Sequence, residues 1–286
     1  MTRRLIVTAD DFGMSVEVNE AVEVAHRAGV LTCASLVTAG AAAEDAIRRA
    51  KRMPTLGVGL HLALFGAPAQ LRGEPGSRIA RDGVNLGDSP ATTGAAIVLS
   101  PRARAAARRE IAAQFEAWRH TGLPLSHLDG HWHCHQHPAV LAMALELGKP
   151  HGLRAVRIPY ENFMLSLRVA GGSARFKRLA EAIGHYPLAL TMRHQLRRAG
   201  MRTNDWFFGK NDEGKMTAAL LARLAEKLPS GVTEVDLHPA TRRWPTLHAP
   251  PADWDPVGEL HALTDPALRE TIRANCVELC RWSDLP

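Results

Sequence analysis

The amino-acid sequence predicts an α/β protein in which parallel strands alternate with helices. Short apolar runs alternate with helical patterns along the 286 residues, and polar residues cluster where several apolar runs end. No repeat, heptad, low-complexity tract or linker divides the chain. Strands separated by helices favour a parallel sheet or barrel, and a single α/β barrel commonly has this length. We therefore expect one domain, spanning residues 1–286.

The expected elements follow from the periodicity of apolar residues. Runs of strand length cover residues 5–9, 31–37, 56–64, 126–130, 155–158 and 233–237. Helical patterns cover residues 16–28, 41–52, 101–120 and about 266–282. The helix at 101–120 has a proline at its start and Gly122 just after its end, as helix boundaries prefer.

Residues 66–100 interrupt this alternation. The segment is dense in Gly, Pro and Asp and shows no helical or strand periodicity. Long irregular segments in compact domains are often lids or binding loops. We therefore expect residues 66–100 to form a lid or substrate loop.

Composition limits the class of protein. With 46% hydrophobic and 22% charged residues, the sequence is typical of a soluble globular protein. The apolar run at 5–9 is too short for a signal peptide, and no other run approaches a membrane span. The four cysteines are too sparse for a disulfide scaffold, and Cys276 and Cys280 are expected to be buried in the last helix. These features predict a cytoplasmic protein with reduced thiols.

Positive charge is concentrated in one segment. Residues 163–203 contain eight Arg or Lys and one acid, Glu181, so their net charge is +7. The net charge of the whole chain is +6, so the remaining residues together carry −1. One interpretation is a basic helical segment exposed to solvent. The alternative is a peripheral contact with anionic lipid, because apolar residues alternate with the charges. No nucleic-acid-binding motif accompanies the charge, so we expect no nucleic-acid partner.

Polar residues follow the predicted strands at the positions where the active sites of α/β folds form. Asp10 and Asp11 follow the first apolar run, His61 lies late in the third, and His238 follows the last. Adjacent acids repel each other unless a positive charge lies beside them. In a strand or tight turn their side chains diverge, so one can bind a cation while the other faces a substrate. A carboxylate with two imidazoles suits Zn²⁺ or a similar divalent ion with positions left open for water.

A run of alternating His and Asp residues follows the fourth predicted strand. In an extended segment, side chains at a spacing of two point the same way. Burying six such groups on one face is costly without a metal or a polar network. A metal or catalytic site is therefore expected, with a structural network of neutral imidazoles as the alternative for some members. The six residues are His127, Asp129, His131, His133, His135 and His137.

Together these motifs resemble the YdjC/ChbG family of carbohydrate deacetylases. The matching segments, in order along the chain, are TADDFG (8–13), GLHL (59–62), HLDGHWHCH (127–135) and HP (238–239). Within that family, the segments LIVTADDFG (5–13), SPR (100–102) and LRAVRIP (153–159) are similar to the hopanoid-biosynthesis-associated branch, HpnK. The resemblance covers nearly the whole chain, and its specificity lies in the combination of motifs.

The resemblance implies a single-domain distorted β/α barrel related to NodB-like polysaccharide deacetylases. It implies one divalent ion, with Zn²⁺ or Mg²⁺ expected and Co²⁺ or Mn²⁺ as alternatives. The matching metal ligands are Asp11, His61 and His131, and the matching catalytic residues are Asp10 as general base, His238 and Arg157. The residues expected in the substrate pocket are His133, His135, Phe12 and Trp132, of which Trp132 departs from the commoner family motif.

This resemblance implies removal of an N-acetyl group from an amino sugar. Asp10 would accept the proton of the attacking water, Arg157 would hold Asp10 in place, and His238 would protonate the departing amine. The expected substrate is an N-acetylglucosaminyl hopanoid at the inner membrane face, and a homodimer is an expected assembly. The alternatives are a deacetylase of soluble chitooligosaccharides, a metal-dependent phosphoesterase or amidohydrolase, and a non-catalytic glycolipid-binding protein.

Overall fold

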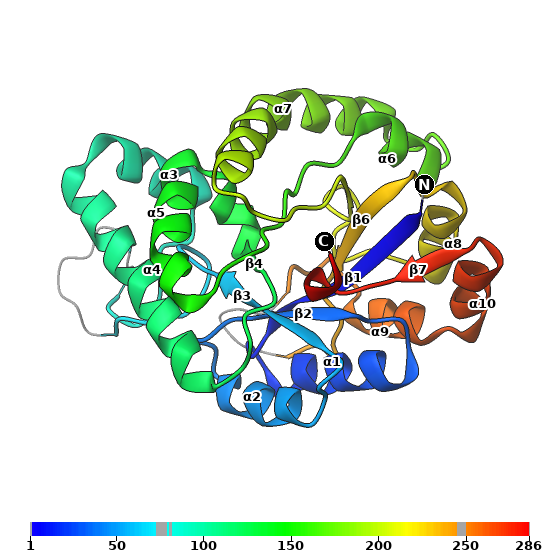
Figure 1. Cartoon of the computed structure of the whole chain (residues 1–286), viewed down its shortest axis with the longest axis horizontal. Helices are drawn as coiled ribbons and strands as arrows, with labels where there is room; N and C mark the ends of the chain where they lie inside the picture. Colours follow the sequence, from blue (N-terminus) through cyan, green and yellow to red (C-terminus); the bar gives the residue numbers. More distant parts are fainter. Residues whose placement is uncertain (1, 73–78, 80–81, 245–249, 286) are drawn as a thin grey trace.

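Parallel strands form the centre of the fold. The computed structural model describes residues 2–72, 79, 82–244 and 250–285. Within these residues one sheet runs in the order β4 (Leu128–Gly130), β3 (Gly57–Leu62), β2 (Cys33–Leu36), β1 (Arg3–Phe12), β6 (Gly231–Leu237) and β5 (Trp206–Phe208) (Figure 1). A further strand, β7 (Val277–Leu279), pairs with the start of β1, and every ladder is parallel.

Helices surround this sheet (Figure 1). Every residue of β2 and β3 is buried, as expected for parallel strands that are covered on both faces. The helices are α1 (Val16–Ala28), α2 (Ala43–Lys51), α3 (Pro90–Leu99), α4 (Pro101–Thr121), α5 (Pro138–Gly148), α6 (Phe163–Val169), α7 (Arg175–Arg198), α8 (Ala218–Lys227), α9 (Pro256–Thr264) and α10 (Pro266–Ala274). The Ser100 hydroxyl accepts a hydrogen bond at the start of α4, and Gly122 ends that helix in the left-handed conformation.

The sheet curls into a barrel that is closed in an irregular way. Between β4 and β5 the described chain makes single bridges in place of a ladder: Val156 pairs with Leu128 of β4, and Glu161 pairs with Phe207 of β5. The strand predicted at 155–158 is therefore reduced to isolated bridges. The curled parallel sheet with its surrounding helices confirms the predicted distorted β/α barrel.

The segment 66–100 is more regular than its composition indicates. Residues 90–99 form α3, which begins at Ser89 as its N-cap. Nearer the start of the segment, the backbone N–H groups of Gln70 and Leu71 donate to the buried Glu110 carboxylate on α4. The prediction of a wholly irregular segment is wrong for these parts, because capping and a helix carboxylate satisfy the backbone. Residues 73–78 and 80–81 lie outside the described residues, and the lid remains a prediction.

The C-terminal region also differs from the prediction. The helix expected to reach residue 282 ends at Ala274, and β7 follows it. Cys276 adopts a left-handed conformation (φ 51°) between the two elements and is exposed, so its predicted burial is wrong. Cys280 is buried as expected. The strands β5 and β7, three residues each, were not predicted, because so short a run carries no periodic signal.

Gly59 shows how closely the elements pack behind the site. A Cβ atom at this position in β3 would overlap the imidazole of His127. That ring is fully buried, stacks on Trp282 with centroids 5.4 Å apart, and lies 3.1 Å from the Ser35 hydroxyl. His127 is therefore a packing residue that cannot move aside, which explains the glycine.

Replacing Gly59 by alanine is expected to lower the free energy of unfolding by about 1–3 kcal/mol, because the buried ring would have to shift. Urea denaturation followed by circular dichroism measures this change. Gly184→Ala in α7 is the matched control, since a Cβ there meets no atom within 4 Å. Equal unfolding midpoints for the two variants would contradict the packing argument.

Candidate active site

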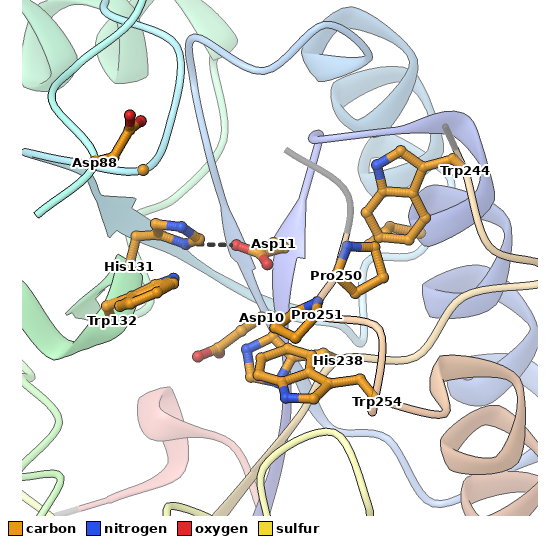
Figure 2. Close-up of a pocket in the computed structure, with 12 residues that line it drawn as sticks. Asp10, Asp11, Asp88, His131, Trp132, His238, Trp244, Pro250, Pro251 and Trp254 are labelled. Carbon is orange, nitrogen blue, oxygen red and sulfur yellow. Dashed lines mark hydrogen bonds and ion pairs between the residues drawn. The ribbon is translucent and has the colours of Figure 1, made fainter. Parts of the chain in front are cut away.

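The predicted site residues meet at the carboxyl ends of the strands. Asp10 and Asp11 lie near the end of β1, and His61 lies near the end of β3. His131 follows β4 directly, and His238 follows β6 directly. A cleft of about 260 Å³ opens at this edge (Figure 2). Its lining includes Asp10, Asp11, His131, His238, Trp132 and Trp254.

A bulge in β1 brings both adjacent acids to the cleft. The register of β1 on β2 shifts between Ala9 and Phe12, and Asp11 is left-handed there with φ 63°. In a regular strand, neighbouring side chains would face opposite sides of the sheet. The extra residue of a bulge re-aims side chains, and aspartate tolerates the left-handed region better than most residues. As a result, Asp10 and Asp11 both line the cleft.

Asp11, His61 and His131 form a group that could hold a metal ion. One ligand atom from each residue lies within 4.8 Å of the others. The Oδ1 atom of Asp11 is 3.6 Å from Nε2 of His61 and 2.9 Å from Nδ1 of His131. The other ring nitrogen of His61 lies 2.9 Å from the Asp129 carboxylate, an arrangement that orients metal-binding histidines in proteins.

A second group meets the same distance limits, but its carboxylate oxygens already accept hydrogen bonds from other side chains. It consists of Asp10, His61 and Asp129. Both oxygens of Asp10 accept hydrogen bonds from Arg157, and Asp129 accepts from the Ser35 hydroxyl and pairs with Arg157. The oxygens of Asp11, by contrast, face the imidazoles and the cleft. The Asp11 group therefore fits a divalent ion better than the second group does.

The pKa values of Asp11 and His61 show that the carboxylate and the imidazoles of this group stabilise each other's charged forms. Burial alone would raise the pKa of Asp11, but the nearby histidines, led by His131, hold that pKa well below its usual range. Burial alone would lower the pKa of His61, but Asp129 and the other carboxylates raise it to about 9. Asp11 therefore stays ionised, and a divalent ion would compete with protons for the imidazole nitrogens.

Arg157 organises the acids behind the cleft. Its guanidinium has no exposed surface and binds Asp10 through two nitrogens, at 2.6 and 2.9 Å. The same group lies 2.9 Å from Asp129 and 3.0 Å from Glu234. Such a fork fixes the orientation of the Asp10 carboxylate. Burial raises the pKa of Glu234 despite its contact with Arg157, so one guanidinium must compensate several buried acids.

His238 lies on the β6 side of the same cleft (Figure 2). Its ring packs on Trp254, with centroids 4.6 Å apart, and its Nε2 atom is 3.7 Å from the Glu213 carboxylate. Burial lowers the pKa of His238, but Glu213 and the two aspartates outweigh burial and raise it above its ordinary value. The imidazole therefore keeps its proton to higher pH than a free histidine.

Glu213 and Trp254 were missed by the sequence analysis. Both lie outside the recognised motifs, in loops that follow β5 and precede α9. Gly214, at φ 70°, lets the Trp254 indole approach the backbone so closely that a Cβ would overlap the ring. In the sequence, the only sign of this contact is a glycine next to Glu213, and that pair does not indicate which aromatic residue packs against it.

The histidine run does not continue as an extended segment. Residues His131–Gln136 form a tight 3₁₀ turn in which Trp132 and His133 are left-handed, at φ 48° and 55°. The prediction that all six groups share one face is therefore wrong beyond Gly130, because the chain reverses direction there. His131 reaches the cleft, whereas the buried His135 ring lies 3.1 Å from the Arg157 carbonyl oxygen.

The four residues predicted for the substrate pocket do not all lie in the cleft. Trp132 lines the cleft, and its side chain is 56% exposed. His133 and His135 do not line the cleft, and burial lowers the pKa of both rings, which favours their neutral forms. Phe12 has no exposed surface and belongs to the main core. Its place in the pocket is therefore corrected, because the bulge that exposes the acids turns Phe12 inward.

A curled parallel barrel with carboxylates and imidazoles gathered at its carboxyl edge defines the class: a β/α-barrel protein with a candidate metal-binding active site. The model of the family described as YdjC-like protein matches residues 4–274. The chain belongs to this family.

Several relatives are similar along almost the whole chain. A carbohydrate deacetylase of Mus musculus is 32% identical, covering 99% of this chain and 94% of that protein. A carbohydrate deacetylase of Geobacillus stearothermophilus is 30% identical over 99% of this chain and 98% of its own length. An Enterococcus faecalis V583 protein, described as taking part in cellobiose-phosphate cleavage, has a similar fold, with a TM-score of 0.69 and 19% identity over 99% of this chain and 98% of that one.

Proposed function

We propose that this protein is a metal-dependent carbohydrate deacetylase that removes the acetyl group from an N-acetylglucosaminyl substrate. The observation that carries the proposal is the pairing of Asp10, fixed by Arg157, with the adjacent Asp11 group in one cleft. The carbohydrate deacetylases among its relatives support the reaction class. A hydrolase of this type needs an activated water, a proton acceptor and a proton donor.

Each requirement has a residue in the cleft. A divalent ion held by Asp11, His61 and His131 would lower the pKa of water and polarise the acetyl carbonyl. Asp10 accepts the proton of the attacking water, and Arg157 keeps its carboxylate aimed at the cleft. The protonated His238, on the β6 side, donates a proton to the departing nitrogen. Trp132 and Trp254 offer the flat apolar faces on which sugar rings pack.

The direct test is release of acetate from N-acetylglucosaminyl substrates by the protein loaded in turn with Zn²⁺, Mg²⁺, Co²⁺ and Mn²⁺. We expect acetate release that a chelator abolishes and that added metal restores. Zn²⁺ or Mg²⁺ should support the highest rate. Release of phosphate from phosphoesters would instead favour a phosphoesterase, and glycolipid binding without any turnover would favour a binding protein.

The decline of activity at high pH should report the proton donor. Because the acids around His238 raise its pKa, kcat/KM should fall as pH rises through a value above the ordinary 6.5. Removing the largest raising contribution in Glu213→Gln should move this decline to lower pH. A pH profile of acetate release measures the midpoint.

The matched control for this profile is Glu226→Gln, which removes an exposed carboxylate from α8. Its profile should coincide with that of the unmodified protein. An unchanged midpoint in Glu213→Gln would argue against His238 as the donor.

For the substrate itself, the proposal is an N-acetylglucosaminyl hopanoid, with soluble chitooligosaccharides as the alternative. The motifs shared with the HpnK branch support the lipid. Mass spectrometry of hopanoid-containing lipid extract treated with the metal-loaded protein should show loss of one acetyl group. Loss from chitooligosaccharides alone would favour the soluble substrate.

Peripheral membrane contact through residues 163–203 is part of the same proposal. On α7, apolar side chains at helical spacing are exposed: Phe176, Leu179, Ile183, Tyr186 and Leu190. Exposed basic residues lie near both ends of this helix, among them Arg175, Lys177, Arg197 and Arg198. An apolar helix face with flanking cations suits an anionic bilayer surface. Among the described residues, no helix has the length and apolar composition to cross a membrane.

Cosedimentation with vesicles tests this contact. The protein should bind vesicles that contain anionic phosphatidylserine, and binding should weaken with salt and in the double variant Arg197→Ser, Arg198→Ser. Equal binding to neutral vesicles would contradict the electrostatic part of the proposal. The cytoplasmic location and the homodimer remain predictions.

A further inference from the structure

The start of α9 holds two loops of the candidate active site together. Glu259, in the first turn of this helix, has only 1% of its surface exposed. One oxygen of its carboxylate accepts a hydrogen bond from the backbone N–H of His238, at 2.6 Å, and the other accepts from the backbone N–H of Met216, at 3.1 Å. His238 follows β6, whereas Met216 lies in the loop between β5 and α8. One side chain therefore links the ends of two neighbouring strands.

The two linked loops carry the proposed proton donor and its acidic partner. Glu213 precedes Met216 by three residues, and its carboxylate lies 3.7 Å from Nε2 of His238. Trp254, just before α9, packs on the His238 ring (Figure 2). The distance between the imidazole and the Glu213 carboxylate therefore depends on how the two loops are held.

A carboxylate suits this position better than an amide does. Burying a carboxylate is costly unless hydrogen bonds compensate it, and here two N–H groups donate to it. Both carboxylate oxygens accept, whereas a glutamine has one acceptor oxygen and would turn its NH₂ group toward the other backbone N–H. Backbone hydrogen bonds from Asp255 to Gly214, at 2.7 Å, and from Ala240 to Pro256, at 3.0 Å, each hold one loop to the start of α9. The Glu259 carboxylate holds both.

The charge of Glu259 also acts on the imidazole. Burial lowers the pKa of His238, but four carboxylates from three parts of the chain outweigh burial and raise it. They are Glu213 of the β5–α8 loop, Asp11 and Asp10 of β1, and Glu259 of α9. Burial raises the pKa of Glu259 itself to about 7, against the lowering effect of His238 and the two N–H donors. Above that pH the carboxylate is mainly charged and accepts both hydrogen bonds.

We propose that Glu259 is a positioning residue for the deacetylation: by holding both loops, it keeps the His238 imidazole paired with Glu213 at the cleft. This inference rests on the proposed function, in which His238 donates the proton to the departing nitrogen. Glu259 is not among the described residues that line the cleft. It therefore acts through His238 and does not touch the substrate.

Two variants separate the position of the carboxylate from its charge. Glu259→Gln keeps the shape of the side chain but removes the charge and one acceptor. Glu259→Asp keeps the charge but is one methylene shorter, so it cannot reach both N–H groups. In both variants the imidazole should move away from Glu213, and we expect the pKa of His238 to fall. We also expect kcat to fall by about tenfold to a hundredfold with KM nearly unchanged, since misplacing a catalytic group by about 1 Å has effects of that size.

Nuclear magnetic resonance of the metal-loaded protein with labelled histidine measures the pKa of His238 without any turnover. The spectrum of His238→Asn identifies the resonance. The pH profile of acetate release from an N-acetylglucosaminyl substrate gives the corresponding decline in kcat/KM, which should move to lower pH in both Glu259 variants.

Glu110→Gln is the matched control for a purely structural effect. Glu110 on α4 is likewise buried and accepts hydrogen bonds from two backbone N–H groups, those of Gln70 and Leu71. This change should lower the midpoint of urea denaturation about as much as Glu259→Gln does. It should leave the pKa of His238 unchanged.

The outcomes separate the two hypotheses. An unchanged pKa of His238 in the Glu259 variants overturns the positioning role, whatever happens to their stability. A pKa that falls in Glu259→Gln but not in Glu259→Asp also overturns it, because the charge alone would then explain the effect. Absence of acetate release from the unmodified protein defeats the proposed function alone, and the histidine titration then decides the role of Glu259.

Amide hydrogen exchange of the unmodified protein tests the link without any variant. Because one carboxylate retains both donors, the N–H groups of Met216 and His238 should open together and exchange at the same rate. Clearly different rates would show that the two loops move independently and would overturn the proposal.

Discussion

Replacing Asp11 by alanine is expected to abolish tight metal binding and to lower kcat/KM for deacetylation by more than about a hundredfold. Loss of a group that merely orients a ligand typically costs about 10–100-fold in affinity or activity. Asp11 is the carboxylate that both His61 and His131 face, so its loss removes the shared negative charge of the group. The effect should therefore exceed that of Asp129→Asn, which only loosens the orientation of His61.

Metal content by mass spectrometry and acetate release measure this prediction together. Glu270→Ala, which removes an exposed carboxylate from α10, is the control and should retain both metal and rate. Circular dichroism establishes that each variant is folded. An Asp11→Ala protein that keeps its metal and its rate would remove the Asp11 group from the mechanism.

The largest effect on stability is expected for Arg157→Met. Methionine fills the space but leaves Asp10, Asp129 and Glu234 buried without their cation. Breaking a buried ion pair by removing one partner costs about 3–5 kcal/mol. The unpaired acids should then take up protons at higher pH than free carboxyl groups do. The loss should therefore be greatest at neutral pH and should diminish as pH falls.

Urea denaturation at several pH values measures this dependence. Arg242→Met is the control, because Arg242 makes a surface pair with Glu17 and is 76% exposed. Pairs of that kind contribute about 0–1 kcal/mol. Arg157→Lys should recover part of the stability, since the charge is kept, but less of the rate, since the fork that orients Asp10 is lost. A pH-independent loss in Arg157→Met would contradict the electrostatic explanation.

Much of the fold could be predicted because alternation and burial are local signals. The apolar runs at 5–9 and 233–237 became the neighbours β1 and β6, and the boundaries of α4 follow from Pro101 and Gly122. Elements of three residues, such as β5, have no period to detect. The segment 155–158 has strand composition, but pairing with both neighbours depends on the curvature of the whole barrel.

The site residues that lie at strand ends could be predicted from the sequence. The site residues that lie in turns and loops could not. Asp10, Asp11 and His61 lie in strands whose positions the pattern indicates. The turn of Trp132 and His133 carries neither Gly nor Pro, so alternation continued in the sequence after the strand had ended. Trp254 reaches the cleft and Glu213 reaches His238 through tertiary packing, for which one sequence contains no spacing rule.

The irregular closure of the barrel has a further consequence. Where β4 and β5 are joined by single backbone bridges, Arg157 connects the strands from inside through its contacts to Asp10 of β1, Asp129 of β4 and Glu234 of β6. The ionic network that orients Asp10, the proposed proton acceptor, thus also ties the bridging segment to three strands of the sheet. Catalytic competence and resistance to unfolding are therefore not independent traits in this protein, and substitutions around Arg157 should change the two together.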